Sequence, residues 1–255
     1  MTLDMFKLND RVALVTGGNK GLGFAMSNAL AGAGANVVLT SRDLGMAQSS
    51  AEAIAQATGR HTLGLEVDVT DTDQVETMVQ SVVEQFGRID ILINNAGINI
   101  RKPIDELDEE SWDLVQNTNL KAPFLCTRAV AKHMKNQQYG RIINVSSMLG
   151  IVALPERGAY CSSKGGLIQF TKVIALELAP YNITVNALCP GPFATEINTP
   201  VFNNSEASRF FLDRIALNRW GRPEELGGAA VFLASEASSF MTGSSIVIDG
   251  GFTAT

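Results

Sequence analysis

The sequence contains few of the side chains that bind metals or build disulfide frameworks. Its 255 residues include three cysteines, Cys126, Cys161 and Cys189, and no C-x-x-C pair. An odd number of cysteines without that spacing argues against a disulfide scaffold and a zinc site, and it suits a reduced, cytoplasmic chain. The two histidines, His61 and His133, have no partner at metal-ligand spacing. We therefore expect no metal ion and a cytoplasmic location.

Long apolar runs and basic runs are missing as well. No window approaches eighteen consecutive apolar residues, and the first ten residues lack the basic segment and apolar stretch of a secretory signal. The formal net charge is -6, and no basic cluster is interleaved with aromatic residues. The sequence therefore predicts no membrane-spanning helix, and it argues against nucleic acid or an anionic membrane surface as the partner. We expect a small-molecule substrate.

Short apolar runs, rich in β-branched residues, are plentiful. Hydrophobic residues make up 45% of the chain, which is enough for a large core. Seven runs with little alternation predict strands that are covered on both faces: residues 12–15, 36–40, 63–68, 89–94, 141–145, 183–188 and 245–249. Amphipathic stretches lie between them, for example residues 71–87, where apolar side chains recur every three or four positions and Gly87 supplies a stop signal.

This alternation predicts an α/β fold with a doubly wound, seven-stranded parallel sheet and helices on both faces. No linker rich in proline, glycine or serine interrupts the chain, and no internal repeat is present, so we expect one domain over residues 1–255. Ligands of such sheets bind at the carboxyl ends of the strands. The residues that follow each predicted strand are therefore the candidates for a site.

A glycine-rich turn, TGGNKGLG, follows the first predicted strand, with glycines at Gly17, Gly18, Gly21 and Gly23. Glycine lets the backbone approach a pyrophosphate closely, and the N-terminus of the helix that follows favours the anion. The spacing departs from the G-x-G-x-x-G dinucleotide fingerprint, and a plain tight turn is the alternative. The position after the first strand of an α/β pattern favours a dinucleotide.

The end of the second predicted strand bears on which dinucleotide is bound. An NAD site normally has an acidic residue here, which bonds the ribose 2'-hydroxyl. This chain has Ser41 and Arg42 instead, and an arginine suits a 2'-phosphate. Lys20 could reach the same group, although both cations could also be solvated surface charges. We predict NADP(H) in preference to NAD(H).

Polar residues also follow the third and fourth predicted strands. Asp68 could accept a hydrogen bond from the adenine amino group or cap the next helix, although Asp71 is better placed for the cap. The stretch NNAG, from Asn94 to Gly97, predicts side chains that bridge neighbouring loops beside the coenzyme. As a bare tetrapeptide, NNAG could belong to any loop.

The fifth predicted strand leads to Ser147, and Tyr160 and Lys164 follow four positions apart. Residues i and i+4 share one face of a helix. Reduction of a ketone needs a proton on oxygen, and a free tyrosine, with a pKa of about 10, holds its proton too tightly near neutral pH. A nearby ammonium and a bound nicotinamide would lower that pKa by about two to three units. The alternative is an ordinary surface pair.

These motifs, in this order, resemble those of the short-chain dehydrogenases/reductases over nearly the whole chain. T-G-x-x-x-G-x-G matches residues 16–23, N-N-A-G matches residues 94–97, Y-x-x-x-K matches residues 160–164 and P-G matches residues 190–191. The resemblance implies a single-domain Rossmann fold. It also implies NAD(P)-dependent interconversion of a secondary alcohol and a ketone.

The resemblance implies roles for single residues. Tyr160 would be the general acid in reduction and the base in oxidation, and Lys164 would hold the nicotinamide ribose. Ser147 would donate a hydrogen bond to the substrate oxygen. Asn119 would organise a water relay behind the lysine, unless its amide only bonds locally within a helix. Thr195 would contact the nicotinamide carboxamide. The full set of expected coenzyme contacts is Thr16, Gly17, Asn19, Lys20, Gly21, Leu22, Gly23, Ser41, Arg42, Asp68, Val69, Asn95, Ala96, Gly97, Tyr160, Lys164, Pro190, Gly191 and Thr195.

The substrate is less constrained. Residues 192–220 mix polar and aromatic side chains and are the expected lid. Arg101 and Arg157 could bind a substrate carboxylate or could be exposed charges. The segments NNAGINIRKP and GPFATEIN are most similar to those of gluconate 5-dehydrogenases and related sugar-acid or polyol dehydrogenases. Alternatives are a 3-oxoacyl-ACP reductase or general carbonyl reductase and, remotely, a non-catalytic cofactor-sensing protein.

The helix predicted after Tyr160 has a wide apolar face, formed by Leu167, Phe170, Val173, Ile174 and Leu178. Such a face covers either the intramolecular core or a neighbouring subunit. Members of the family are often tetramers with this helix at an interface. We therefore expect a homotetramer or a dimer.

Overall fold

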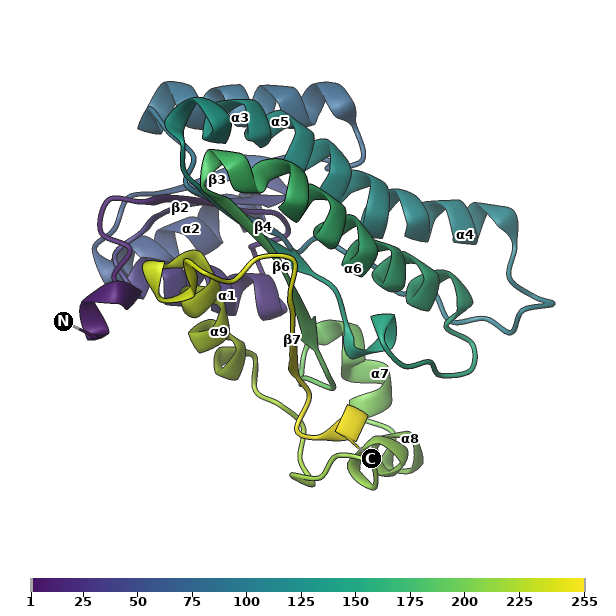
Figure 1. Ribbon diagram of the computed structural model, residues 1–255. Coiled ribbons are helices and arrows are strands. Elements are labelled where there is room, and N and C mark those ends of the chain that lie inside the picture. Colours follow the sequence, from purple (N-terminus) through teal and green to yellow (C-terminus); the bar gives the residue numbers. More distant parts are fainter. Residues whose placement is uncertain (1, 255) are drawn as a thin grey trace.

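A parallel sheet of seven strands forms the centre of the molecule (Figure 1). The structure is a computed structural model that describes residues 2–254. The strand order is β3-β2-β1-β4-β5-β6-β7, and it reverses between β1 and β4. The strands are β1 (Val12–Val15), β2 (Asn36–Ser41), β3 (Thr62–Glu66), β4 (Ile91–Asn94), β5 (Gly140–Val145), β6 (Ile183–Pro190) and β7 (Ser245–Ile248). The predicted fold class is confirmed.

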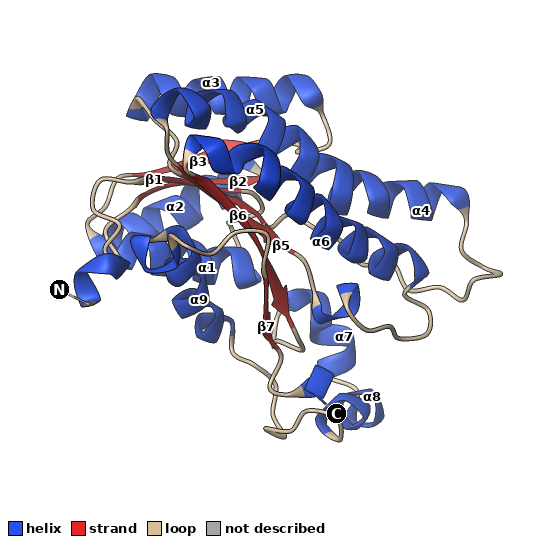
Figure 2. Cartoon of the chain, in the orientation of Figure 1, coloured by secondary structure: helices blue, strands red, loops and turns tan. Residues whose placement is uncertain are grey.

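Two layers of helices cover the sheet (Figure 2). One core cluster packs α1, α2 and α9 against one face, and a second packs α3, α5 and α6 against the other. The helices are α1 (Gly21–Gly32), α2 (Leu44–Thr58), α3 (Thr72–Phe86), α4 (Glu109–Gln116), α5 (Ala122–Gln137), α6 (Gly158–Leu178), α7 (Thr199–Phe202), α8 (Ser205–Leu212) and α9 (Gly227–Ala234). Strands buried on both faces explain why the runs read as almost continuously apolar.

The predicted strands are all present and differ from the observed ones only at their ends. β3 ends at Glu66, before Asp68, because the backbone N–H of Asp68 donates to the side chain of Gln74. β4 begins at Ile91, after Ile89, because the Gln137 amide takes both backbone groups of Ile89. In both places a side-chain amide replaces a strand partner, and the apolar pattern gives no sign of it.

The ends of α3 follow from local chemistry, as the sequence predicts. The Asp71 side chain accepts from the backbone N–H groups of Asp73 and Gln74. This satisfies two donors that the first turn of a helix leaves without partners. Gly87 ends the helix in the left-handed region, at φ 76°.

A buried carboxylate lies at the amino ends of the strands. Asp90, just before β4, is fully buried. It accepts from Arg11 Nη1 at 3.0 Å, from Arg88 Nε at 2.8 Å and from the backbone N–H of Val12 at 2.9 Å. Because three donors surround it, the charge of Asp90 is well compensated, and its hydrogen bond raises the pKa of Arg88.

An aromatic ring continues this network. The guanidinium carbons of Arg11 and Arg141 lie 3.8 and 4.5 Å from the centre of the Tyr139 ring. Arg141 is almost fully buried and pairs with Glu236 at 3.2 Å. Burial raises the pKa of Tyr139 to about 12, so its hydroxyl stays neutral. We call these residues, together with Asp90 and Arg88, the amino-edge cluster.

Among the described residues, no helix is both long and apolar enough to cross a membrane. Across residues 2–254, no group of three or more His, Cys, Asp or Glu side chains is arranged to hold a metal ion.

Candidate active site

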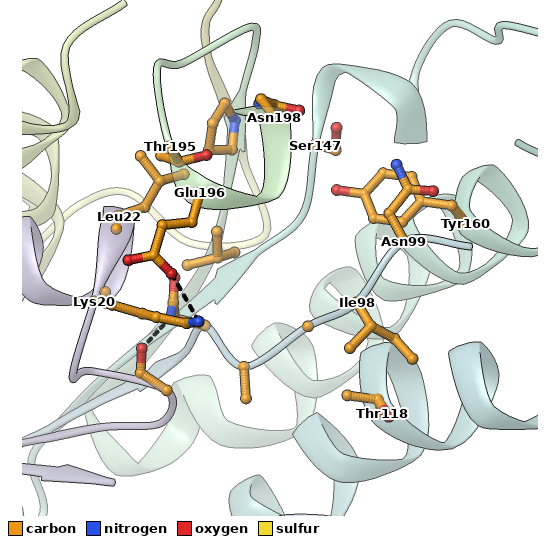
Figure 3. Close-up of a pocket in the computed structure, with 18 of the residues that line it drawn as sticks. Lys20, Leu22, Ile98, Asn99, Thr118, Ser147, Tyr160, Thr195, Glu196 and Asn198 are labelled. Atoms are coloured by element: carbon orange, nitrogen blue, oxygen red, sulfur yellow. Dashed lines mark hydrogen bonds and ion pairs between the residues drawn. The ribbon is translucent and has the colours of Figure 1, made fainter. Parts of the chain in front are cut away.

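A cavity of about 880 Å³ opens at the carboxyl ends of the strands (Figure 3). The glycine turn, the ends of β2, β4 and β5, the start of α6 and the segment after β6 all contribute to its lining. Every expected coenzyme contact lines it except Thr16. Ser147, Tyr160 and Lys164 line it as well, whereas Asn119 does not. The structure therefore brings almost all of the predicted site residues into one place.

The glycine turn forms a cradle that side chains would fill. Gly17 and Gly21 have φ values of 60° and 52°, which favour glycine. A Cβ atom on Gly23 would lie 2.2 Å from the carbonyl oxygen of Gly17. In the described part of the chain, no side chain caps the start of α1, so the first N–H groups of the helix remain available. This arrangement fits the pyrophosphate of a dinucleotide.

Thr16 and Asn95 tie the glycine turn to the loop after β4. The Thr16 hydroxyl accepts from the backbone N–H groups of Asn95 and Ala96, at 3.0 and 3.2 Å. The Asn95 amide donates to the carbonyl oxygens of Thr16 and Gly17, at 3.0 and 2.9 Å. The predicted bridging role of this loop is confirmed. Thr16 thus acts from behind the cavity and shapes the turn.

At the adenosine end, the carboxylate of Asp68 is held by its own loop. It accepts from both the backbone N–H and the hydroxyl of Thr70, at 2.9 and 2.7 Å. These hydrogen bonds hold the pKa of Asp68 below its usual value, and the charge of Arg42 acts in the same direction. Asp68 does not cap α3, so that alternative is wrong. Arg42 and Asp68 both line the adenosine end of the cavity, and they lie close enough for the charge of Arg42 to act on Asp68.

Lys20 is directed elsewhere than the sequence suggests. Its Nζ atom lies 2.8 Å from Glu196 Oε2, and both side chains are exposed. The pair joins the glycine turn to the segment after β6, as the dashed line in Figure 3 shows. Because Lys20 already has a carboxylate partner, Arg42 is the better candidate for a 2'-phosphate. No sequence pattern predicts this pairing, because the two residues are far apart in the chain.

Tyr160 and Lys164 lie one turn apart near the start of α6, and Ser147 lies at the end of β5. Lys164 Nζ is 5.8 Å from the centre of the Tyr160 ring and donates to the carbonyl oxygen of Val145 at 2.8 Å. Ser147 and Tyr160 lie at the same end of the cavity in Figure 3, where the Ser147 hydroxyl acts to lower the pKa of the phenol. The helix that the i,i+4 spacing predicts is therefore present.

The expected lowering of the Tyr160 pKa joins Lys164 with a bound nicotinamide, and it stays a prediction for the complex with coenzyme. Burial raises the pKa of Tyr160, and the hydrogen bond with Ser147 and the charge of Arg157 act against burial. Burial also lowers the pKa of Lys164, to about 8. The expectation overlooked desolvation, which disfavours the charged form of both groups. Arg157 is a cation whose charge lowers the pKa of the phenol, and Lys164 lies 5.8 Å from the centre of the ring.

Asn119 lies in a π-helical turn, Asn117–Lys121, between α4 and α5. Its side chain accepts from the backbone N–H of Ile98 at 2.8 Å and donates to the Ile98 carbonyl at 2.9 Å and to Ser163 Oγ at 3.1 Å. The alternative of a purely local helix bond is wrong. Single π turns often mark functional sites.

Gly97 leaves open the space between Asn119 and Lys164. A Cβ atom there would lie 3.2 Å from Asn119 Oδ1 and 3.5 Å from Lys164 Nζ. The missing side chain therefore keeps a path between the amide and the ammonium. Asn119 is a positioning residue in this arrangement, because it reaches the cavity only through its neighbours.

The two ends of the segment predicted as a lid, residues 192–220, lie side by side. Phe193 and Gly221 form an isolated parallel bridge, and the Gly221 N–H donates to the Pro192 carbonyl at 2.9 Å. α7 and α8 lie between these ends. Phe211 and Trp220 line the cavity, with ring centroids 5.5 Å apart. The segment thus supplies an aromatic wall.

Several lining residues have no counterpart in a motif. Asn99, Thr118, Leu154 and Asn198 line the cavity, and Asn99 lies at its Tyr160 end in Figure 3. The Asn99 amide oxygen is buried without a hydrogen-bond partner. Only the position of Asn99 soon after NNAG could have drawn attention to it. Loop side chains of this kind vary in type, so no spacing predicts them.

A family model described as Enoyl-(Acyl carrier protein) reductase matches residues 17–253. The chain belongs to the short-chain dehydrogenase/reductase family. Its short-chain dehydrogenase relatives include gluconate 5-dehydrogenase of Gluconobacter oxydans (strain 621H), which is 39% identical over 98% of this chain and 97% of that protein. The chain is therefore an oxidoreductase that acts on CH–OH groups, and the predicted family is confirmed.

Other short-chain dehydrogenase relatives carry different names. NAD-dependent glycerol dehydrogenase of Listeria innocua serovar 6a is 36% identical over 97% of this chain and 96% of that protein. The 3-oxoacyl-[acyl-carrier-protein] reductase of Synechocystis sp. (strain ATCC 27184 / PCC 6803 / Kazusa) is 38% identical over 97% of this chain and 98% of that protein. Similar identities accompany different names, so overall identity does not decide the substrate.

Among solved structures of short-chain dehydrogenases, one is a gluconate 5-dehydrogenase from Burkholderia cenocepacia J2315 in complex with NADP and tartrate. It superposes on this chain with a TM-score of 0.97 at 36% identity, and each chain is fully covered (100%). A neighbour of this similarity supports NADP use.

Proposed function

We propose that the protein interconverts a secondary alcohol and a ketone on a sugar acid or polyol, with NADP(H) in preference to NAD(H). The proposal rests on the grouping of Ser147, Tyr160 and Lys164 in a cavity whose other half is the glycine-lined cradle. The bound nicotinamide coenzyme supplies or accepts the hydride. The residues of the chain handle the proton and the charge that develops on oxygen.

Tyr160 gives its hydroxyl proton to the substrate oxygen in reduction and takes it back in oxidation. Ser147, which lines the same cavity as Tyr160, donates to the same oxygen as charge develops. Lys164, with a pKa of about 8, is mostly protonated at neutral pH and can hold the ribose hydroxyls. Asn119 supports the path past Gly97 by which a proton returns to Tyr160.

Arg42 supports the preference for NADP(H). It lines the cavity at the end of β2, where an acidic residue would bond the ribose 2'-hydroxyl of NAD. An arginine matches a phosphate in charge and in geometry. The gluconate 5-dehydrogenase structure with NADP supports the same choice, whereas the glycerol dehydrogenase relative is named as NAD-dependent.

The runner-up is a 3-oxoacyl-ACP reductase, which the Synechocystis relative supports. Its substrate is carried on an acidic protein, so a basic surface near the cavity mouth would favour it. Lys102, Arg128 and Lys132 are the candidates for such a surface. Lys102 pairs with Asp108, Arg128 lies 3.7 Å from Glu76, and none of the three lines the cavity. The sugar acid or polyol is therefore the better-supported class.

We also propose that residues 1–255 form one domain with a lid over residues 192–220, and that the protein is a cytoplasmic homotetramer or dimer. Leu167, Ile174 and Leu178 are buried within the chain, which leaves less of α6 for a partner than the sequence suggests. Val173 and Leu176 are 53% and 77% exposed on the same helix. Exposed apolar residues that gather on one surface support a subunit contact. Light scattering after gel filtration measures the mass directly.

The decisive experiment measures initial rates on sugar acids and their keto acids, polyols and ketosugars, and β-ketoacyl thioesters. Each substrate is run with NADP(H) and NAD(H) side by side. We expect the highest kcat/KM with a keto acid or ketosugar and NADPH. Faster turnover of the thioesters would establish the runner-up, and equal rates with both coenzymes would contradict the role of Arg42.

A further inference from the structure

The end of the cavity beside Tyr160 carries two guanidinium groups from different loops. Arg101 follows β4, and Arg157 immediately precedes α6; both line the cavity. The Arg157 side chain is only 11% exposed. Burial lowers the pKa of Arg157, and the charge of Arg101 lowers it further. Two cations thus share a partly desolvated wall, which favours the binding of an anion between or beside them.

Within residues 2–254, Arg157 has only weak partners for its charge. Its Nη1 donates to the carbonyl oxygen of Glu156 at 3.4 Å, and the Glu156 carboxylate lies 3.9 Å away on an exposed side chain. By contrast, the carboxylate of Asp90 lies 2.5 Å from Arg88 and 3.0 Å from Arg11. A guanidinium with five donors and such loose partners has donors to offer a ligand.

The acidic residues that line the cavity, within the described part of the chain, are all engaged elsewhere. Glu196 pairs with Lys20, Asp68 accepts from Thr70, and Asp43 caps α2 by accepting from the Met46 N–H. These three carboxylates belong to the coenzyme half. The half beside Tyr160 therefore has an excess of positive charge.

The position of Arg157 is fixed by the chain around it. The backbone N–H of Lys102 donates to the Glu156 carbonyl at 3.2 Å, which joins the two arginine loops. Glu156 has φ 62°, a left-handed conformation that a non-glycine residue keeps only where its surroundings hold it. The Lys102 side chain is in turn bonded to Asp108 and Ser111 at the start of α4. These hydrogen bonds hold the turn that carries Arg157, and so they restrict where its guanidinium can lie.

Arg157 is also the residue that precedes the 21-residue helix α6, and no side chain caps that helix. An anion bound to Arg157 near this end gains from the helix dipole as well as from the two guanidinium charges. Tyr160 lies within the first turn of the same helix, and the charge of Arg157 acts on its phenol. One short piece of backbone therefore sets the separation between the cation and the proton donor.

We infer that Arg157 binds the carboxylate of the substrate, with Arg101 adding charge, while Tyr160 and Ser147 bind the reacting oxygen. This inference rests on the proposed function and narrows its substrate class from sugar acids or polyols to hydroxy acids. A carboxylate held in two hydrogen bonds fixes both ends of the substrate. The carbon presented to the coenzyme then depends on the distance between Arg157 and Tyr160.

The test compares kcat/KM for a keto acid and for a neutral ketose of the same chain length. Arg157→Met removes the charge at similar length, and Arg157→Lys keeps the charge without the planar fork. Arg60→Met is the matched control, because Arg60 bonds Asp10 and Asn36 outside the cavity. Thermal melts of each variant check that it folds.

We expect Arg157→Met to lower kcat/KM for the keto acid by about 10- to 100-fold, the loss of a hydrogen-bonded charge. Arg157→Lys should recover part of this loss. The value for the neutral ketose should fall several-fold less than that for the keto acid, because only the effect of Arg157 on the Tyr160 phenol is common to both substrates. Equal losses on the acid and on the neutral substrate would overturn the inference. So would an unchanged value for the acid.

A binding measurement separates this inference from the proposed function. Tartrate is titrated into the NADPH complex and the thermal shift is recorded, with no turnover needed. We expect a shift in wild type and Arg60→Met, and a much smaller one in Arg157→Met. Equal shifts in all three proteins would show that Arg157 does not bind the anion, and this would contradict the inference even if sugar acids are substrates. A shift that depends on Arg157, without turnover of any sugar acid, polyol or ketosugar, would refute the proposed function and keep the site.

Discussion

The two edges of the sheet use the same charged residue types in opposite ways. At the amino edge, Asp90 is surrounded by Arg11, Arg88 and a backbone N–H, and the buried Arg141 has Glu236. At the carboxyl edge, the buried Lys164 donates to a carbonyl oxygen and has no carboxylate partner among the described residues, and the Arg157 guanidinium lies 3.9 Å from the Glu156 carboxylate. The ion-paired side chains at the amino edge stabilise the fold, whereas the weakly paired cations at the carboxyl edge are available to bind ligands.

The pKa directions express the same contrast. The bond to Asp90 raises the pKa of Arg88, so folding favours the charged form at the amino edge. Burial lowers the pKa of both Lys164 and Arg157, so folding disfavours the charged form at the carboxyl edge. The carboxyl edge therefore costs stability that the amino edge helps to offset. Removing a charge should then have opposite effects on stability at the two edges.

The largest expected effect is on turnover at the carboxyl edge. Tyr160→Phe removes the hydroxyl that carries the proton, so we expect kcat to fall about 10³- to 10⁴-fold. The ring stays in place, and NADPH affinity and the melting temperature should hardly change. Tyr181→Phe, in the 3-10 turn Ala179–Tyr181 that follows α6, is the matched control. Activity above a tenth of wild type would refute the role of Tyr160.

The largest effect on stability is expected at the amino edge. Asp90→Asn leaves two arginines without their carboxylate, and we expect the free energy of unfolding to fall by about 3–5 kcal/mol. Denaturant titration measures it. Asp10→Asn, which breaks an ion pair on a carboxylate that is 89% exposed, should cost less than about 1 kcal/mol. A similar loss in both variants would show that burial of Asp90 is unimportant.

Lys164→Met should abolish turnover and stabilise the fold, by up to roughly 2 kcal/mol at pH 7. The stabilisation arises because folding lowers the pKa of Lys164 from 10.5 to about 8, which makes it unfavourable to bury the charged lysine at pH 7. The variant also loses the hydrogen bond to the Val145 carbonyl, which subtracts about 1 kcal/mol from this gain.

The same shift predicts a pH dependence. The unfolded chain keeps the Lys164 proton up to about pH 10.5, whereas the folded chain loses it near pH 8. The free energy of unfolding of the wild-type protein therefore rises with pH between these two values. The difference in unfolding free energy between wild type and Lys164→Met should shrink over that window. A difference that stays constant with pH would contradict the assigned shift.

The smallest effects separate two cations at the coenzyme half. Arg42→Ala should weaken NADPH binding by about 10- to 100-fold, since a charge-assisted bond to phosphate is lost, and leave NADH binding nearly unchanged. Lys20→Met should change NADPH binding by less than about fivefold, because its exposed pair with Glu196 contributes little. Fluorescence titration gives both constants. A larger loss of NADPH affinity in Lys20→Met than in Arg42→Ala would show that Lys20, and not Arg42, binds the 2'-phosphate.

The sequence predicts what depends on neighbours along the chain. The strands are recognisable because both faces are buried, and the cap of α3 by Asp71 depends on three adjacent residues. The Lys20–Glu196 pair, the partners of Asn119 and the bracing of Glu156 by Lys102 depend on tertiary packing. So does the sign of the pKa shift at Tyr160, because burial is not visible in a motif.

The π-helical turn at Asn117–Lys121 puts a length requirement on the motif around Asn119. The N–H of Ala122 reaches back five residues, to the carbonyl of Asn117, where an α-helix would reach back four. Deleting one residue after Asn119 in this stretch would restore a regular helix and rotate the preceding side chains by about 100° relative to α5. Every signature residue would still be present, yet the amide would face away from Ile98. A homologue shortened by one position here would thus score as intact in a motif search and lack the amide's contacts.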